Sequence, residues 1–222
     1  MNEKLIADIK GLLGPREDLP GILARSGRVL MSGWDTVRKG RYYVMGLNPG
    51  GEAEKAEQRS DTIGETLEQH PRAWNYFASD EAAGHAGSVL SVMTALEAEP
   101  LSTLTTNALF LRSPTAVTLP TDSRKVWEDH CAPVHAHLLR IVQPDVVVCF
   151  GIDSWKYLTG QGDPGHWRFH PDMHLRVAGT EHSCGVLLLP HFSGQARATW
   201  TKNASVLDAS IAAARNHQHA TA

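Results

Sequence analysis

Residues 41–51 read Arg-Tyr-Tyr-Val-Met-Gly-Leu-Asn-Pro-Gly-Gly, a short apolar run followed at once by residues that break regular structure. The aromatic and β-branched residues of the first half favour a buried strand. Gly46, Pro49 and the two glycines after it then turn the backbone into a loop. Ligands of open α/β sheets bind outside the carboxyl ends of the strands, and Asn48 offers a side-chain amide at this turn. The stretch therefore predicts a strand that ends at a binding site.

Three further segments have the composition of buried strands, because each is short, apolar and bounded by turn signals. They span residues 104–110, 146–150 and 186–189, and helical patterns separate them. Residues 159–183 are rich in Gly, Pro and His and leave room for a short strand near residues 174–178. Alternating strands and helices predict an α/β fold. We expect a three-layer α/β/α sandwich with a central, mostly parallel four-stranded sheet.

The helical patterns are clearest at the two ends of the chain and before the third strand. Residues 2–13 place their apolar side chains on one helical face, and residues 199–215 do the same. A longer pattern covers residues 122–142, where Pro133 predicts a kink or a break.

Length and composition predict one globular domain. The chain has 222 residues, of which 42% are hydrophobic and 20% charged, and these values are typical of a folded protein with a single core. We expect one domain over residues 1–222, with residues 1–40 as a helical N-terminal lead-in and residues 216–222 as a frayed tail.

The net charge of −3 argues against a protein that coats nucleic acid without specificity, and it gives no reason to expect membrane binding. The charge is unevenly distributed, however. Residues 51–100 hold ten acidic and three basic side chains, which leaves the remainder of the chain at +4. A local surface that faces DNA is compatible with this distribution.

The cysteines and histidines do not form a pattern that binds a metal. Cys131, Cys149 and Cys184 are far apart, so neither a disulfide framework nor a four-cysteine cluster is expected. Pro171 interrupts the four-residue spacing of the histidines around it, which argues against a shared metal. No apolar run approaches the roughly 20 residues of a membrane span, and the first residues lack a signal-peptide pattern. We expect a cytoplasmic monomer that needs no metal or other cofactor.

Two features of the sequence leave a structural and a functional interpretation open. Asn107 lies inside an apolar strand, where a buried amide without hydrogen-bond partners costs a few kcal/mol of stability. Its amide therefore either stabilises the fold through hydrogen bonds or recognises a ligand. Trp74, Tyr76 and Phe77 either fill the core beneath the first loop or include a residue that stacks on a planar ligand.

Taken in order, four segments resemble the uracil-DNA glycosylase superfamily. Gly46-Leu47-Asn48-Pro49-Gly50 is similar to its first motif, as found in the mismatch-specific uracil/thymine and single-strand-selective branches. Thr106-Asn107-Ala108-Leu109 resembles the middle strand whose Asn reads the edge of uracil. The second motif, His-Pro-Ser-Pro or a related sequence after the last strand, resembles His191-Phe192-Ser193-Gly194. Residues 131–151 are similar to the thermophilic iron–sulfur branch, although the cluster cysteines are missing.

The resemblance implies a monofunctional DNA glycosylase that hydrolyses the N-glycosidic bond of uracil, or of a related deaminated base, and leaves an abasic site in base excision repair. Asn48 would position the attacking water, and His191 would hydrogen-bond the uracil O2 as negative charge develops. Asn107 would pair with the N3–H and O4 of the base, and the Gly46 and Leu47 loop would support the same site.

The resemblance also implies contacts to DNA, because the target base must leave the duplex. Phe77 is favoured over Trp74 as the residue that stacks on the base. Ser193 would hold a flanking phosphate, and Gln195 and Arg197 lie where a loop would press on the DNA.

Other interpretations of the same residues remain open. Asn48 before Pro is also a common turn former, and His191 is one of twelve histidines, most of which need no special role. A protein of this fold that binds a base or DNA but is catalytically weak is the main alternative. A nucleotide-binding α/β hydrolase with residues 46–51 as a phosphate cradle ranks last, since the loop lacks the Lys of a P-loop. Gly51 stands where the uracil-specific branch has a Tyr that excludes thymine, which leaves space for bulkier bases.

Overall fold

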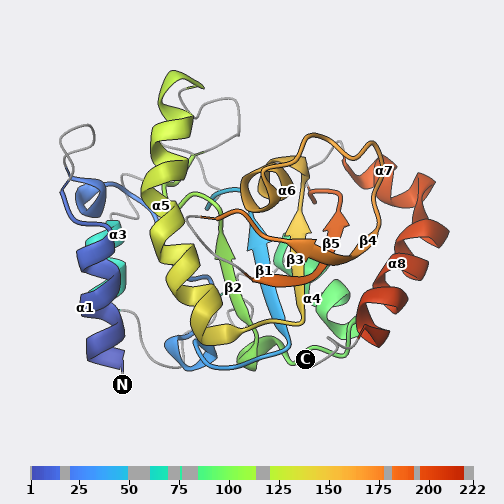
Figure 1. Ribbon diagram of the computed structural model, residues 1–222, viewed down its shortest axis with the longest axis horizontal. Coiled ribbons are helices and arrows are strands. Elements are labelled where there is room, and N and C mark those ends of the chain that lie inside the picture. The colour runs from blue at the N-terminus through green and yellow to red at the C-terminus, as the bar shows by residue number, and fades with distance from the viewer. Residues whose placement is uncertain are drawn as a thin grey trace.

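The computed structural model describes residues 2–15, 21–49, 61–69, 76, 85–113, 121–177, 182–192 and 196–217. These residues form an α/β fold around one sheet with the strand order β2-β1-β3-β5-β4 (Figure 1). The strands are β1 (Tyr42–Gly46), β2 (Leu104–Asn107), β3 (Val146–Phe150), β4 (Phe169–His174) and β5 (Ser183–Leu189). The sequence-based prediction of an α/β fold with a mostly parallel sheet is confirmed, and the sheet has five strands rather than four.

Four of the five strands run in the same direction. β1 pairs with β2 and β3, and β3 pairs with β5, always in parallel register. The carboxyl ends of these four strands therefore meet at one edge of the sheet. At the amino edge the Tyr42 hydroxyl donates to the carbonyl of Leu96 at 2.8 Å, which ties β1 to the chain after α4 (His85–Ala95).

β4 is the additional strand, and it lies antiparallel to β5 at the edge of the sheet. It spans residues 169–174, earlier in the chain than the short strand considered near residues 174–178. Its register shifts between His170 and Met173, and Asp172 has a φ of 55°. Pro171 is tolerated there because an edge strand does not need every backbone N–H for pairing.

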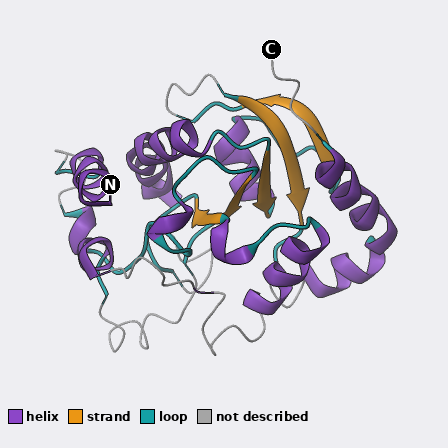
Figure 2. Cartoon of the chain, turned by 90° about the horizontal axis from the view of Figure 1, so that it is seen from below, coloured by secondary structure: helices purple, strands orange, loops and turns teal. Residues whose placement is uncertain are grey.

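Helices cover both faces of the sheet, which makes a three-layer arrangement (Figure 2). Besides α4, the described α-helices are α1 (Asn2–Leu12), α3 (Ile63–Gln69), α5 (Thr121–Val142), α6 (Ile152–Thr159), α7 (Ala196–Lys202) and α8 (Ala204–Asn216). α5 continues through Pro133 without a break, and the pattern predicted over residues 199–215 is divided between α7 and α8. Short 3-10 helices are formed by Ile22–Ala24, Trp34–Thr36 and Pro100–Ser102.

Two hydrophobic cores lie on opposite faces of the sheet because side chains alternate along each strand. One face of β1 carries Tyr43 and Met45, which pack with apolar residues of α1, α5 and α6. The other face carries Tyr42 and Val44, which pack with α4 and α8. Figure 1 shows α1 and α5 side by side at one flank and α7 and α8 at the other. Among the described residues, no helix is both long enough and apolar enough to span a bilayer.

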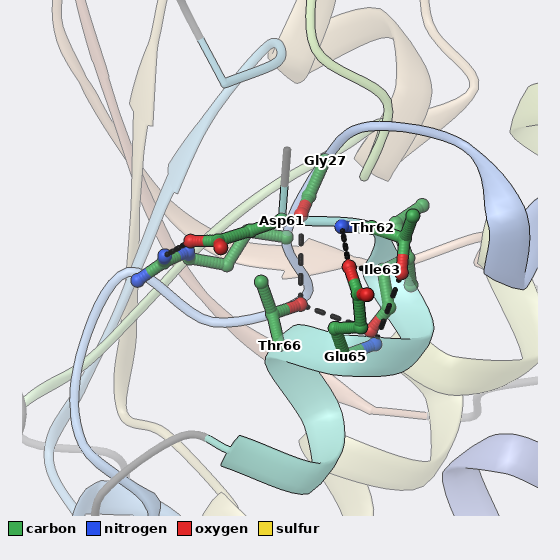
Figure 3. Close-up of polar contacts among 7 residues, drawn as sticks. Gly27, Asp61, Thr62, Ile63, Glu65 and Thr66 are labelled. Carbon is green, nitrogen blue, oxygen red and sulfur yellow. Dashed lines mark hydrogen bonds and ion pairs between the residues drawn. The ribbon is translucent and has the colours of Figure 1, made fainter. Parts of the chain in front are cut away.

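The segment before β1 is tied to the chain that follows β2. Isolated antiparallel bridges join Gly27 to Leu111 and Leu30 to Thr106. α3 packs against this segment and begins with a capping box, in which Thr62 and Glu65 bond each other (Figure 3). The carboxyl end of β2 is thus held from both sides, by β1 and by the N-terminal segment.

Candidate functional site

The candidate site lies at the shared carboxyl edge of the parallel strands. Asn107 ends β2, Gly46 ends β1 with Asn48 two residues later, and His191 comes two residues after the end of β5. β1 neighbours β2, whereas β3 separates β1 from β5. With neighbouring strands about 4.8 Å apart, the segments that carry Asn48 and His191 lie about 10 Å from each other at the level of the sheet.

Asn107 is a buried amide, with 7% of its surface exposed. A Cβ on Gly46 would lie 2.6 Å from the Oδ1 of Asn107, so any other residue at position 46 would force this carboxamide to move. The Nδ2 of Asn107 has no hydrogen-bond partner among the described residues. A buried donor in that state loses about 1–3 kcal/mol relative to a satisfied one, so a ligand that offers an acceptor would recover this energy.

The loop after β1 and the chain after β2 are joined by backbone hydrogen bonds. The N–H of Ala108 donates to the carbonyl of Gly46 at 2.9 Å, and the N–H of Leu109 donates to that of Leu47 at 2.8 Å. Further along, the N–H of Ser113 donates to the carbonyl of Pro49 at 3.2 Å. These bonds join the segment of Gly46 and Leu47 to the chain that follows Asn107.

The amide of Asn48 stabilises this loop. Its Nδ2 donates to the carbonyl of Pro49 at 3.0 Å and to that of Ser113 at 3.1 Å. The side chain is half-buried. With the amide hydrogens committed to carbonyls, Oδ1 is the atom of the Asn48 side chain that can accept a hydrogen bond from a water or a ligand. An amide oxygen can orient a water but is too weak a base to take its proton.

His191 belongs to the same edge and is exposed to solvent. Its Cβ would be 3.6 Å from a Cβ on Gly151, which has a φ of 96° and so favours glycine. Desolvation by the surrounding protein lowers the pKa of His191, and the carboxylate of Asp153 in α6 opposes this effect. The imidazole is therefore mostly neutral near pH 7, and a neutral imidazole carries one N–H donor.

Aromatic packing holds Phe192, the residue that follows His191. The ring of Phe192 stacks on Trp200 of α7 with centroids 4.7 Å apart and 15° between the planes. Phe192 also contacts Phe150 at the end of β3, with centroids 5.0 Å apart. These two contacts account for an aromatic side chain at position 192. The sequence did not indicate this contact, because Trp200 appears there only as part of an amphipathic helix.

The remaining predicted site residues are not placed by the structure. Trp74, Phe77, Ser193 and Gln195 lie outside the described residues, and Arg197 lies in the first turn of α7 with its side chain outside them.

The histidines and cysteines of the described part do not gather into a group of three or more ligands that could hold a metal ion. The rings of His166 and His170 stack at 5.9 Å, and His170 packs on Trp155 at 4.5 Å. All three cysteines are buried and free, and burial raises the pKa of each thiol.

No protein-family model matches this sequence, and a comparison with curated protein sequences found no match.

Proposed function

We propose that the protein is a DNA glycosylase that hydrolyses the N-glycosidic bond of uracil, or of a related deaminated base, flipped out of DNA. The observation that carries the proposal is the buried Asn107 carboxamide, which packs over Gly46 and has a donor without a partner among the described residues. Its position at the carboxyl edge of the sheet, beside the loop of Asn48, matches the arrangement that the sequence motifs imply.

A carboxamide offers one donor and one acceptor side by side, and uracil offers the complementary pair. The Nδ2 of Asn107 would donate to O4, and its Oδ1 would accept from N3–H. Cytosine has an amino group at position 4 and an unprotonated N3, so donor and acceptor are exchanged. A buried amide that cannot pair discriminates strongly against such a base.

Bond cleavage would be accelerated mainly by stabilisation of the departing base. As the C1′–N1 bond breaks, the sugar becomes oxocarbenium-like and the base departs as an anion. The neutral imidazole of His191 would donate a hydrogen bond to O2, where part of the negative charge develops. A water held by the Oδ1 of Asn48 would then add to C1′ and release its proton to solvent.

DNA binding would involve residues around this edge. Phe77 would stack on the flipped base, and Ser193, Gln195 and Arg197 would contact the strand on either side. The overall charge of −3 limits nonspecific binding, so recognition would depend on local contacts. We further propose that the enzyme acts as a cytoplasmic monomer in base excision repair.

One observation favours a second candidate, a protein of this fold that binds a base or damaged DNA without cutting it. The amide hydrogens of Asn48 are committed to Pro49 and Ser113, so the residue stabilises the turn, and an amide cannot take a proton from water as a carboxylate can. An enzyme that relies on leaving-group stabilisation alone can be slow.

The test is a cleavage assay with labelled oligonucleotides that carry one uracil, hypoxanthine, xanthine or mismatched thymine, in single and double strands. Alkaline treatment breaks the strand wherever a base has been removed. A break at one lesion would establish the activity and its substrate. If the folded protein yields no break with any of them, the proposed glycosylase activity is wrong, and binding of a base or damaged DNA without cleavage is favoured.

A further inference from the structure

A fully buried chain of polar groups lies beneath the candidate site, on the opposite face of the sheet from the Asn107 carboxamide. It consists of Tyr43 in β1, His135 in α5 and the carbonyl of Ala108, the residue after β2. All three residues have 0% of their surface exposed. Neither the sequence motifs nor the proposed chemistry uses Tyr43 or His135.

The direction of these hydrogen bonds follows from the carbonyl, which can only accept. The Nε2 of His135, 3.1 Å from the oxygen of Ala108, must carry the hydrogen. Nδ1 is then the acceptor, and the Tyr43 hydroxyl donates to it at 2.8 Å. Burial lowers the pKa of His135 to about 4, against a smaller opposing effect of the Ala108 and Asn107 carbonyls, so the ring keeps this neutral form at physiological pH.

These hydrogen bonds hold the backbone at the end of β2, directly beside the residue that carries the Asn107 side chain. Both backbone polar groups of Ala108 are hydrogen-bonded. Its N–H donates to the carbonyl of Gly46, and its carbonyl accepts from the Nε2 of His135. The Asn107 carboxamide, by contrast, has no partner for Nδ2 among the described residues. Its orientation therefore depends on the backbone that carries it and on its contact with Gly46.

We propose that Tyr43 and His135 are positioning residues, which fix the Asn107–Ala108 backbone so that the Asn107 carboxamide faces an incoming base. The identity of that base rests on the proposed function, whereas the positioning of Asn107 does not. The rings of Phe110 and Tyr157 close around His135, with centroids 4.9 Å and 5.4 Å from its own, so the imidazole has little freedom to shift. The role belongs to geometry and involves no transfer of the His135 proton.

The neighbouring tyrosine provides a matched control. The hydroxyl of Tyr42 is also a buried donor to a carbonyl, that of Leu96, on the other face of β1 and at the opposite end of the strand from the site. Tyr43→Phe and Tyr42→Phe each remove one buried hydroxyl and keep the ring. Only Tyr43→Phe removes a hydrogen bond from the series that runs from Tyr43 through His135 to the carbonyl of Ala108.

Two measurements on the full-length protein test the inference. The first is the ¹⁵N–¹H resonance pair of the Asn107 side-chain amide, with the ring nitrogens of His135 as a check on the tautomer. We expect Tyr43→Phe to shift the Asn107 pair and Tyr42→Phe to leave it in place. An Asn107 pair that both variants leave unmoved, or that both move alike, would overturn the positioning role.

The second measurement is excision and base binding. We expect Tyr43→Phe to lower the single-turnover rate on uracil-containing DNA, and to weaken inhibition by free uracil, by about tenfold or more, since a displacement of about 1 Å can reduce rates by about 100-fold. Affinity for an oligonucleotide with an abasic site should stay within about twofold, because that ligand lacks the base. Equal losses in Tyr42→Phe, or a full rate in Tyr43→Phe, would contradict the inference.

His135 can be tested with two substitutions of different chemistry. His135→Gln keeps an N–H that can reach the carbonyl of Ala108, whereas His135→Leu leaves that carbonyl unpaired. The inference predicts that Gln retains more of the uracil excision and of the Asn107 resonance position than Leu does. If the wild-type protein excises no base, the proposed function fails, and the resonance comparison still decides whether the two residues position Asn107.

Discussion

Gly46 has no side chain, and the Asn107 carboxamide occupies the space beside a Cβ that any other residue would place there. Turn chemistry alone accounts for a glycine after a strand, so the sequence indicates both residues without indicating their contact. The contact arises because the parallel register pairs Gly46 with Asn107. At this scale the sequence indicates candidate residues, and the packing of neighbouring strands shows why a glycine stands beside Asn107.

Substitution of Gly46 by alanine should therefore displace the Asn107 side chain. The added methyl group would lie 2.6 Å from Oδ1, and overpacking of this kind destabilises a protein by about 1–3 kcal/mol. We expect excision of uracil to fall by about tenfold or more, measured in folded protein. Gly162→Ala is the control, since a Cβ at Gly162 would meet no atom within 4 Å. Equal activity of the two variants would show that the close approach of Asn107 to Gly46 does not affect excision.

His135 also predicts how stability depends on pH. Burial lowers its pKa from 6.5 to about 4 in the folded protein. Between these values the unfolded chain binds a proton that the folded chain does not, so the free energy of unfolding falls as the pH falls from 6.5 towards 4. The titratable groups that contact the ring, Tyr43 and Tyr157, have raised pKa values and stay neutral in this range.

Titration of His135 should lower the free energy of unfolding by about 3 kcal/mol between pH 6.5 and 4. Urea denaturation at several pH values would measure it, and His135→Gln should show a correspondingly flatter dependence between pH 6.5 and 4. Parallel curves for the wild-type protein and the variant would contradict the account. The comparison of the two curves removes contributions from other histidines, such as His170.

Among the secondary-structure elements, the four parallel strands were predictable and β4 was not. Val146–Phe150 and the end of β5 are continuous apolar runs because both of their faces are covered by helices. β4 contains Pro171 and Asp172 and is largely exposed, so its sequence lacks both the apolar run and the alternation that indicate a strand. It forms because β5 offers a pairing edge, which is a tertiary effect.

The α3 helix makes a prediction of its own, since it packs against the segment that supports β2. Thr62 caps its first turn, and the Glu65 carboxylate accepts from both the N–H and the hydroxyl of Thr62. These bonds hold the pKa of Glu65 below its usual value. Thr62→Ala should lower the stability of the protein by about 1 kcal/mol.

Thermal denaturation would measure this effect, with hydrogen exchange of the α3 amides as a local readout. Ser91→Ala is a suitable control, because the Ser91 hydroxyl lies within α4 and donates only to the carbonyl of Gly87 one turn earlier. If the two variants had the same melting temperature, the cap would make no measurable contribution.

In the molecule as a whole, the proposed recognition group and the proposed positioning residues lie on opposite faces of the sheet. The Asn107 carboxamide lies on the face covered by α4 and α8, whereas Tyr43 and His135 lie on the face covered by α1, α5 and α6. The sequence indicated Asn107 because a polar amide stands out within an apolar strand. It did not indicate the positioning residues, since a buried His inside an amphipathic helix resembles an ordinary core residue until its partners are known. Figure 2 shows the helices of both layers around the sheet.

The central claim is that the buried amide of Asn107 recognises uracil in DNA, and excision by Asn107→Asp tests it most directly. A carboxylate can accept from N3–H but cannot donate to O4, so we expect the rate on a uracil-containing oligonucleotide to fall by about 100-fold or more. Asn203→Asp is the matched control, because Asn203 donates to Thr199 where α7 meets α8 and should retain the wild-type rate. An Asn107→Asp protein that is folded and excises uracil as fast as the wild type would contradict the account, as would a folded wild-type protein that leaves the uracil in place.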